Sequence, residues 1–257
     1  MAARRRPGRP GSAHGAGTDL LREEHRRLPE IAPRLPLPVP TPQYLGEPSP
    51  LFPQPWTIVA WVSGEPADGA EIEDESAAAV LAKFLRALHT EVPASAPRDG
   101  GKGERVRNAQ LEFDADLIEV LGEDRVRRIE EIWRDGSSAP DRAGPRVWVH
   151  QDLHPANVVA NGGALAGVID FGELCPGDPA VDLAAAWVLL LLGSTCDFFD
   201  HYGDVDPAMR RRARAAALCC GIFLVRMGVN GQRGLAGGKP GWLAAGRKAL
   251  DRVLEVC

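Results

Sequence analysis

The sequence predicts an α+β chain of two lobes, with a short β-containing N-terminal lobe and a longer, mostly helical C-terminal lobe that carries a β-hairpin. Three observations lead to this prediction. A β-branched, aromatic segment at 56–62 runs into a Gly- and Pro-containing hinge, Asn161-Gly162-Gly163 separates two short apolar runs, and helix-like apolar spacing dominates residues 180–256. Asn and Gly tolerate the positive φ that a tight hairpin turn requires.

Residues 1–17 are rich in Arg, Gly and Pro and show no hydrophobic period, so a disordered basic tail is expected there. A basic arm that contacts nucleic acid is the alternative interpretation. Residues 18–62 are expected to form a partial N-terminal lobe. In it, Thr18 is placed as a helix cap, the Pro-rich stretch at 32–50 favours extended backbone, and WTIVAWV at 56–62 is expected to be a strand.

Residues 63–257 are expected to form the C-terminal lobe, which begins at the hinge Ser63-Gly64-Glu65-Pro66. Apolar spacing predicts helices over 71–89 and 114–134, with a polar loop at 91–108 between them. The remaining elements are three short strands and three helices, at 147–149, 158–160 and 165–169 and at about 180–202, 207–228 and 241–256.

The composition is that of an ordinary globular protein, with 44% apolar and 25% charged residues. The formal net charge of −5 gives no reason to expect a nucleic-acid partner. The longest apolar runs are too short to span a bilayer and nothing at the N-terminus has the pattern of a signal peptide, so no membrane partner is expected. The cysteines form no C-x-x-C pair, which favours reduced thiols and a cytoplasmic location over a disulfide framework or a zinc site.

Residues 150–182 hold a group of polar residues whose spacing is typical of a phosphoryl-transfer site. Asp152 and Asn157 stand five apart, as in a kinase catalytic loop, where the first orients the attacking hydroxyl and the second binds metal. The predicted hairpin then leads to Asp170-Phe171-Gly172, whose Asp is expected to bridge Mg²⁺ to nucleotide phosphates. Asp152, with His150 in support, is therefore the predicted catalytic residue, and Asn157 and Asp170 are the predicted metal ligands.

These motifs resemble those of the aminoglycoside phosphotransferase family, whose pattern is H-G-D-x-H-x-x-N, then I-D-F/W-x, then G-D-P-x-x-D-L-A. The matching residues are His150, Asp152, His154, Asn157, Ile169, Asp170, Gly177, Asp178, Pro179, Asp182, Leu183 and Ala184. Gln151 stands where the family usually has glycine, a position expected to tolerate the change. The likeness extends over roughly residues 19–257 and is most specific at 147–184.

The resemblance implies a protein-kinase-like two-lobe fold with a truncated N-terminal lobe. It also implies Mg²⁺-dependent transfer of phosphate from ATP or GTP to a hydroxyl of a small molecule, either an aminoglycoside- or macrolide-type antibiotic or a metabolite. The hinge backbone at Ala60, Trp61 and Val62 is expected to meet the adenine. Glu24 is expected to pair with a basic residue of an N-terminal strand, and Asp182 to brace the catalytic loop. The identity of the acceptor stays open at this point.

The family begins with two strands and a phosphate-covering loop, followed by a strand that carries the basic residue. Too few residues precede Glu24 for three strands, so the N-terminal lobe is expected to be shortened, with Arg4–Arg6 as the remnant of the basic strand. Either the start codon is placed too late or the gene is truncated. Two other functions stay open, namely a catalytically impaired pseudokinase-like binding module and a metallohydrolase built on His150, Asp152 and His154.

Overall fold

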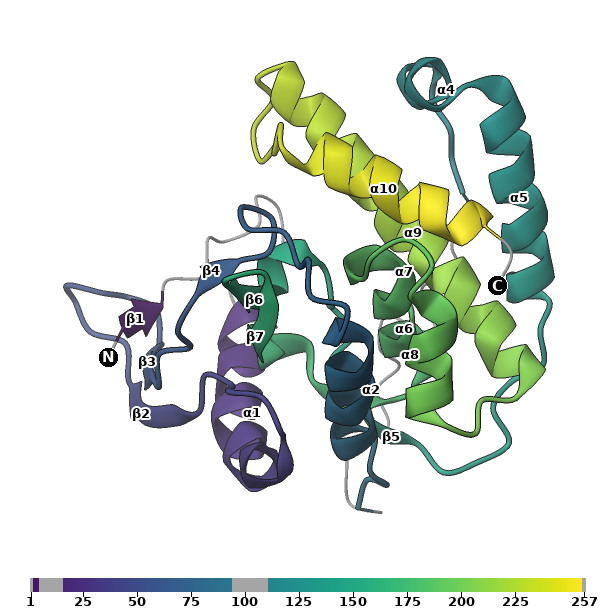
Figure 1. Ribbon diagram of the computed structural model, residues 1–257. Coiled ribbons are helices and arrows are strands. Elements are labelled where there is room, and N and C mark those ends of the chain that lie inside the picture. The colour runs from purple at the N-terminus through teal and green to yellow at the C-terminus, as the bar shows by residue number, and fades with distance from the viewer. Residues whose placement is uncertain (1, 5–15, 94–110, 256–257) are drawn as a thin grey trace.

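The computed structural model describes residues 2–4, 16–93 and 111–255 (Figure 1). Its helices are α1 (Ala16–Ile31), α2 (Ala77–Leu88), α4 (Ala115–Leu121), α5 (Glu123–Ser137), α6 (Ala180–Leu183), α7 (Ala185–Leu189), α8 (Thr195–Tyr202), α9 (Pro207–Gln232) and α10 (Trp242–Leu254). Its strands are β1 (Ala2–Arg4), β2 (Pro42–Gly46), β3 (Trp56–Val59), β4 (Glu65–Pro66), β5 (Val147–Val149), β6 (Val158–Asn161), β7 (Ala164–Val168) and β8 (Cys175–Gly177). Three short 3₁₀ helices complete it: η1 (Ala32–Arg34), η2 (Pro155–Asn157) and η3 (Phe171–Glu173).

The N-terminal lobe holds an antiparallel sheet in the strand order β1-β3-β2. The prediction of a disordered tail over residues 1–17 is therefore wrong at Ala2–Arg4, which pair with β3, and at Ala16 and Gly17, which lie in α1. Pairing of backbone groups with a neighbouring strand requires no apolar side chains, so composition alone did not reveal it. Residues 5–15 of that prediction lie outside the described residues. Thr18 lies inside α1 and does not cap it.

The central β-structure of the C-terminal lobe is a second antiparallel sheet, in the order β4-β6-β7. β6 and β7 form the predicted hairpin, and its two-residue turn places Gly162 and Gly163 at φ 57° and 83°. A two-residue turn with positive φ at both positions matches the twist of the strands that it joins. The predicted hinge contributes β4 to this sheet, with Glu65 opposite Ala160, so the segment between the lobes is anchored beside the hairpin.

Two of the predicted helices are interrupted. The helix expected over 114–134 is divided into α4 and α5 at Gly122, whose φ is 83°. The helix expected over 180–202 consists of α6, α7 and α8, and Gly193, at φ 84°, lies before α8. A right-handed helix cannot continue through positive φ, and glycine adopts that conformation at little cost. The loop predicted at 91–108 lies largely outside the described residues.

The hydrophobic core lies where the C-terminal helices meet the hairpin, and its largest fully buried side chains include Phe84, Phe171 and Phe198. By length and composition alone, α9 could cross a membrane. In this structure, however, 61% of its most apolar 18-residue stretch is buried inside the protein. It packs against α5, α6, α7 and α10. Figure 1 shows it beside the yellow α10. α9 is therefore the central core helix of this lobe.

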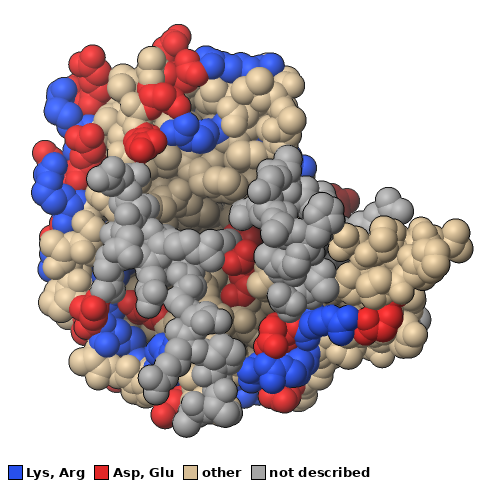
Figure 2. Space-filling model, turned by 180° about the vertical axis from the view of Figure 1, so that it is seen from behind, with Lys and Arg blue, Asp and Glu red and all other residues tan. Residues whose placement is uncertain are grey.

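Charged side chains of both signs are interspersed on the surface. Figure 2, seen from the side opposite to Figure 1, shows blue and red atoms next to each other along much of the outline. Ion pairs such as Lys248–Glu71 and Arg226–Asp114, both at 2.6 Å, reflect this mixing. Asp206 is the N-cap of α9, and its carboxylate accepts the N–H of Met209 at 2.8 Å.

Candidate active site

The catalytic-loop candidates Asp152 and Asn157 contact each other. The side-chain nitrogen Nδ2 of Asn157 donates to the backbone oxygen of Asp152 at 2.9 Å and to its carboxylate Oδ2 at 3.1 Å. Asn157 is buried, whereas the side chain of Asp152 retains 30% exposure. The amide therefore fixes the carboxylate from within the protein and leaves it open to a ligand. Because Nδ2 makes both contacts, the amide oxygen of Asn157 is directed elsewhere.

The hairpin brings Asp170 next to this loop. The N–H of Ile169 donates to the Asn157 carbonyl at 2.9 Å, and Asp170 follows directly. Asp170 has φ 67° and ψ 62°, in the left-handed region. Asp tolerates this region better than most residues, but it still costs about 1 kcal/mol, and strain of this kind is common at functional sites. The two predicted metal ligands are thus brought together from opposite ends of the hairpin.

His150 braces the same junction and is fully buried. Its Nε2 lies 3.1 Å from the Ile169 carbonyl, and its Nδ1 lies 3.3 Å from the N–H of Asp152. A neutral ring with the proton on Nε2 satisfies both contacts, and the ring packs edge-on against Phe171 at 4.7 Å between centroids. Both ring nitrogens are therefore engaged within the protein, which argues against a metallohydrolase that would need His150 as a ligand. In the described part of the chain, no group of three or more His, Cys, Asp or Glu residues could hold a metal ion.

Gln151 occupies a conformation that explains why glycine is usual at this position. Its φ is 68°, and for a residue with a Cβ this costs about 1 kcal/mol. Its side chain is buried and Nε2 donates to the sulfur of Cys175. Burial, together with the nearby charge of Asp182, raises the pKa of the Cys175 thiol to about 12, so the sulfur stays protonated.

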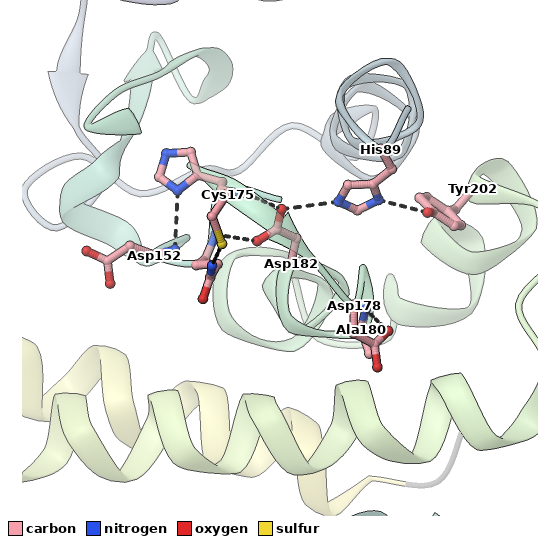
Figure 3. A network of polar contacts seen from close by, with 9 residues as sticks. His89, Asp152, Cys175, Asp178, Ala180, Asp182 and Tyr202 are labelled. Atoms are coloured by element: carbon pink, nitrogen blue, oxygen red, sulfur yellow. Dashed lines mark hydrogen bonds and ion pairs between the residues drawn. The ribbon is translucent and has the colours of Figure 1, made fainter. Parts of the chain in front are cut away.

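Asp182 anchors the catalytic loop to the helical lobe, as the family resemblance implied. Its fully buried carboxylate accepts the N–H of His150 at 2.6 Å and the N–H of Gln151 at 2.8 Å (Figure 3). These two backbone donors lie in the turn just before Asp152, so Asp182 sets the path of the chain into the predicted catalytic residue. A charged acceptor makes such hydrogen bonds shorter and stronger than neutral ones.

A buried chain of hydrogen bonds extends from Asp182 through the end of α2 to the end of α8, and the sequence did not indicate it. His89 was expected only to end the helix, which it does as the C-cap of α2, but its Nε2 also lies 3.1 Å from the Asp182 carboxylate. Its Nδ1 lies 2.8 Å from the Tyr202 hydroxyl, as Figure 3 shows. Burial first, and the charge of Asp182 second, raise the pKa of Tyr202 to about 12, so the hydroxyl donates to His89. No spacing in the sequence links these three residues.

The predicted nucleotide-binding residues lie on the N-terminal side of the site. Glu24 is buried on α1, and α1 packs against η3, the turn that follows Asp170. In the segment between the lobes, the N–H of Ala60 already donates to Thr41 at 3.0 Å, Trp61 is 66% exposed and Val62 is buried. The contact of Ala60, Trp61 and Val62 with the adenine stays a prediction. The pairing of Glu24 with a basic strand residue stays a prediction.

The oxygen donors at the centre of the site fit Mg²⁺. This ion is held in proteins by one or two carboxylates, with phosphate oxygens and water completing an octahedral shell. Asp170 offers a carboxylate, and Asn157 offers an amide oxygen whose partner nitrogen is already used within the loop. No soft thiolate or imidazole ligand is needed, and this donor set is typical of a magnesium–nucleotide site.

Comparison with known proteins identifies the family. The family model described as "APH: Phosphotransferase enzyme family" matches residues 12–218, most of the chain, including the catalytic loop, the hairpin and Asp182. The chain belongs to this phosphotransferase family. Aminoglycoside 3'-phosphotransferases of Escherichia coli and Salmonella typhimurium are each 26% identical to it over 150 residues. These residues are 57% of this chain and 49% of each relative, so the chain spans about half the length of the curated relatives it matches.

Solved structures of phosphotransferases share the fold. The GDP and kanamycin complex of APH(2")-IIia has a TM-score of 0.63 at 20% identity, covering 95% of this chain and 84% of that one. The apoenzyme of macrolide 2'-phosphotransferase MphH from Brachybacterium faecium has a TM-score of 0.54 at 19% identity, covering 88% and 80%. At such identities the likeness concerns the fold alone, and it confirms the predicted α+β, kinase-like architecture with its helical C-terminal lobe.

Proposed function

We propose that this phosphotransferase family member transfers the γ-phosphoryl group of ATP or GTP to a hydroxyl group of a small molecule. The observation that carries the proposal is the hydrogen-bonded junction of Asp152, Asn157 and Ile169, because it assembles a partly exposed carboxylate, an amide and a second carboxylate in one place. Phosphoryl transfer needs little more from a protein than such positioning and charge stabilisation.

Each residue has a distinct part in this chemistry. Asp152 orients the acceptor hydroxyl and accepts its proton as the oxygen bonds to phosphorus and the nucleoside diphosphate leaves. Asn157 and Asp170 would hold Mg²⁺, which supplies neutralising charge at the phosphates when bound. Asp182 and His150 hold the loop through its backbone, so they position Asp152 without touching the acceptor.

The relatives suggest which donors and acceptors to examine first. Solved relatives are complexes with GDP and with AMP-PNP, so both guanine and adenine nucleotides are candidate donors. Kanamycin and hygromycin B occupy two of these relatives, and a third is a macrolide phosphotransferase. We therefore include antibiotic hydroxyls in the proposed acceptor class, and with them antibiotic resistance. A nucleoside triphosphate donor makes the cytoplasm the proposed location.

The test is a transfer assay on the purified chain. MgATP or MgGTP is supplied with kanamycin, hygromycin B or a macrolide, and mass spectrometry detects the gain of one phosphate by the acceptor. The expected result is a product that forms with at least one donor and acceptor and disappears when Mg²⁺ is chelated. Metal-dependent nucleotide binding with neither transfer nor nucleotide hydrolysis would instead identify an impaired binding module. Absence of metal-dependent nucleotide binding would overturn the proposal altogether.

A further inference from the structure

We propose that Trp242 and His154 form a positioning pair that holds Asp152 and Asn157 in their working geometry. The inference rests on the proposed function, because it assigns how the catalytic carboxylate is kept in place. Trp242 is the first residue of α10 and lies outside residues 12–218, the part of the chain that the family model matches. The pair would make the C-terminal helix a structural part of the active site.

Trp242 is fixed from three sides and is only 8% exposed. Its Nε1–H donates to the carboxylate of Asp68 at 2.9 Å. One neighbour of its ring is His154, at 5.1 Å between centroids, and the other is Phe223 of α9, at 6.0 Å. Buried tryptophan typically combines a large packing area with one directed hydrogen bond, and here both are used.

His154 transmits this fixed position to the catalytic residues. Its Nδ1 accepts the N–H of Ala156 at 3.3 Å, which orients the ring within the loop. Its Nε2 lies 3.3 Å from Nδ2 of Asn157 and 3.8 Å from the carboxylate of Asp152. Nε2 therefore lies beside both groups that the catalytic loop presents to the proposed site. The distance to Asp152 is longer than a hydrogen bond but gives an electrostatic attraction that depends on the orientation of the ring.

The pair joins three segments that are remote in sequence. Asp68 follows β4 near the start of the C-terminal lobe, His154 belongs to the catalytic loop, and Trp242 begins the C-terminal helix. Loss of the indole would remove one of the contacts that hold the His154 ring and would let the ring shift relative to Asp152. A displacement of about 1 Å at a catalytic group can lower a rate by roughly 10²-fold, so a residue that never touches the acceptor can still control turnover.

The experiment compares Trp242→Ala, Trp242→Phe and His154→Ala with the wild-type chain. The readouts are kcat for transfer to kanamycin, kcat for hydrolysis of MgATP in the absence of acceptor, affinity for MgATP, and melting temperature. Trp242→Ala is expected to lower both kcat values by about 10- to 100-fold and the affinity for MgATP by a much smaller factor, because Asn157 is only one of the two proposed metal ligands. Trp242→Phe, which keeps a ring against His154, is expected to recover most of the loss. The Trp242→Ala/His154→Ala double variant should be no slower than the slower single variant, because both act through one contact.

Trp187 provides the matched control. It is as well buried, at 3% exposure, and packs against Phe199 at 5.3 Å between centroids. Trp187→Ala should lower the melting temperature without lowering kcat of the folded protein. If Trp242→Ala behaves in the same way, Trp242 is only a packing residue and the inference is overturned.

If Trp242→Ala does not fold, two variants that lack the hydrogen bond between Trp242 and Asp68 test the role of the pair instead. The small loss of kcat that remains in Trp242→Phe should also appear in Asp68→Ala, because both changes remove the same hydrogen bond, and the two together should lower kcat by no more than one alone. Additive effects, or unchanged kcat in both, would contradict the pair. A wild-type chain that binds MgATP but shows neither transfer nor hydrolysis would overturn the proposed function, and the role of the pair with it. A wild-type chain that is active but insensitive to these changes would overturn the pair alone.

Discussion

Asp152 carries the proposed chemistry most directly, because it is the partly exposed carboxylate of the catalytic loop. Asp152→Asn keeps the size of the side chain and an oxygen for the Asn157 amide, but it removes the proton acceptor. Transfer is expected to slow by about 10²–10⁴-fold, the usual effect of a positioned general base. Nucleotide affinity should be unchanged, since the carboxylate serves the acceptor. Steady-state kinetics and nucleotide titration check both, and an unchanged turnover would show that the loop has been wrongly assigned.

Tyr202 should make the stability of the folded protein depend on pH in the alkaline range. Burial and the charge of Asp182 raise the pKa of its hydroxyl from 10.0 to about 12. The folded state therefore holds this proton more tightly than the unfolded state, so stability is constant below about pH 10 and falls as the pH rises toward 12. Tyr202→Phe should remove that part of the alkaline loss, measured by urea denaturation at several pH values. Equal slopes above pH 10 in variant and wild type would contradict the placement of Tyr202 in the network.

At the residue scale, the contacts that the sequence indicates best are those between residues of a single motif, whose spacing is fixed. Asp152 and Asn157 belong to one loop, and Asp182 lies at a fixed offset in a recognisable motif, so their contacts could be anticipated. The His89–Tyr202 link and the Trp242–His154 contact join residues that only the packing of helices brings together. Such contacts leave no periodic signal in a single sequence.

At the scale of elements, the crossing of α9 and α10 supports the site, because α10 presents Trp242 to the catalytic loop. A Cβ added at Gly246 would lie 2.6 Å from the backbone nitrogen of Val225, so the helices meet at glycine. Gly246→Val should force them apart, lower the free energy of unfolding by about 1–3 kcal/mol, and lower kcat through the displaced Trp242. Ala244→Val, on the exposed face of the same helix, is the control and should change neither by a comparable amount.

The result for Gly246→Val can contradict the proposed role of α10 in two ways. Denaturant unfolding and transfer kinetics on both variants give the comparison. If Gly246→Val left stability unchanged, α9 and α10 would not approach as closely as the structure has them. If it lowered stability but left kcat unchanged, the position of α10 would not matter for the catalytic loop.

Element boundaries were the least predictable part of the fold, for physical reasons. Apolar spacing located the helices. It did not show that α4 and α5 are separated at Gly122, where the positive φ of the glycine ends the helix although the apolar pattern continues. The hairpin was predicted correctly because its turn depends on local residues, Gly162 and Gly163. β1 was anticipated only as the remnant of a strand at Arg4–Arg6, and its bounds, Ala2–Arg4, depend on a long-range backbone pairing with β3.

At the scale of the whole molecule, the two lobes meet at the proposed metal–nucleotide site. The hinge anchors to the hairpin through β4, and α1 packs against the turn after Asp170. Nucleotide binding should therefore depend on metal held from the C-terminal lobe. Asp170 contributes a full charge to the ion whereas Asn157 contributes only a dipole, so the two ligands should differ in importance.

Calorimetric titration of ATP and GTP with and without Mg²⁺, on wild type, Asp170→Ala and Asn157→Ala, tests the central claim most directly. The predicted result is binding that requires Mg²⁺ in the wild type, that is abolished in Asp170→Ala, and that is weakened but retained in Asn157→Ala. All three proteins should keep the wild-type circular dichroism spectrum, so that lost binding reflects a lost ligand. Equal nucleotide affinity with and without Mg²⁺, or metal-dependent binding that survives Asp170→Ala intact, would contradict the account.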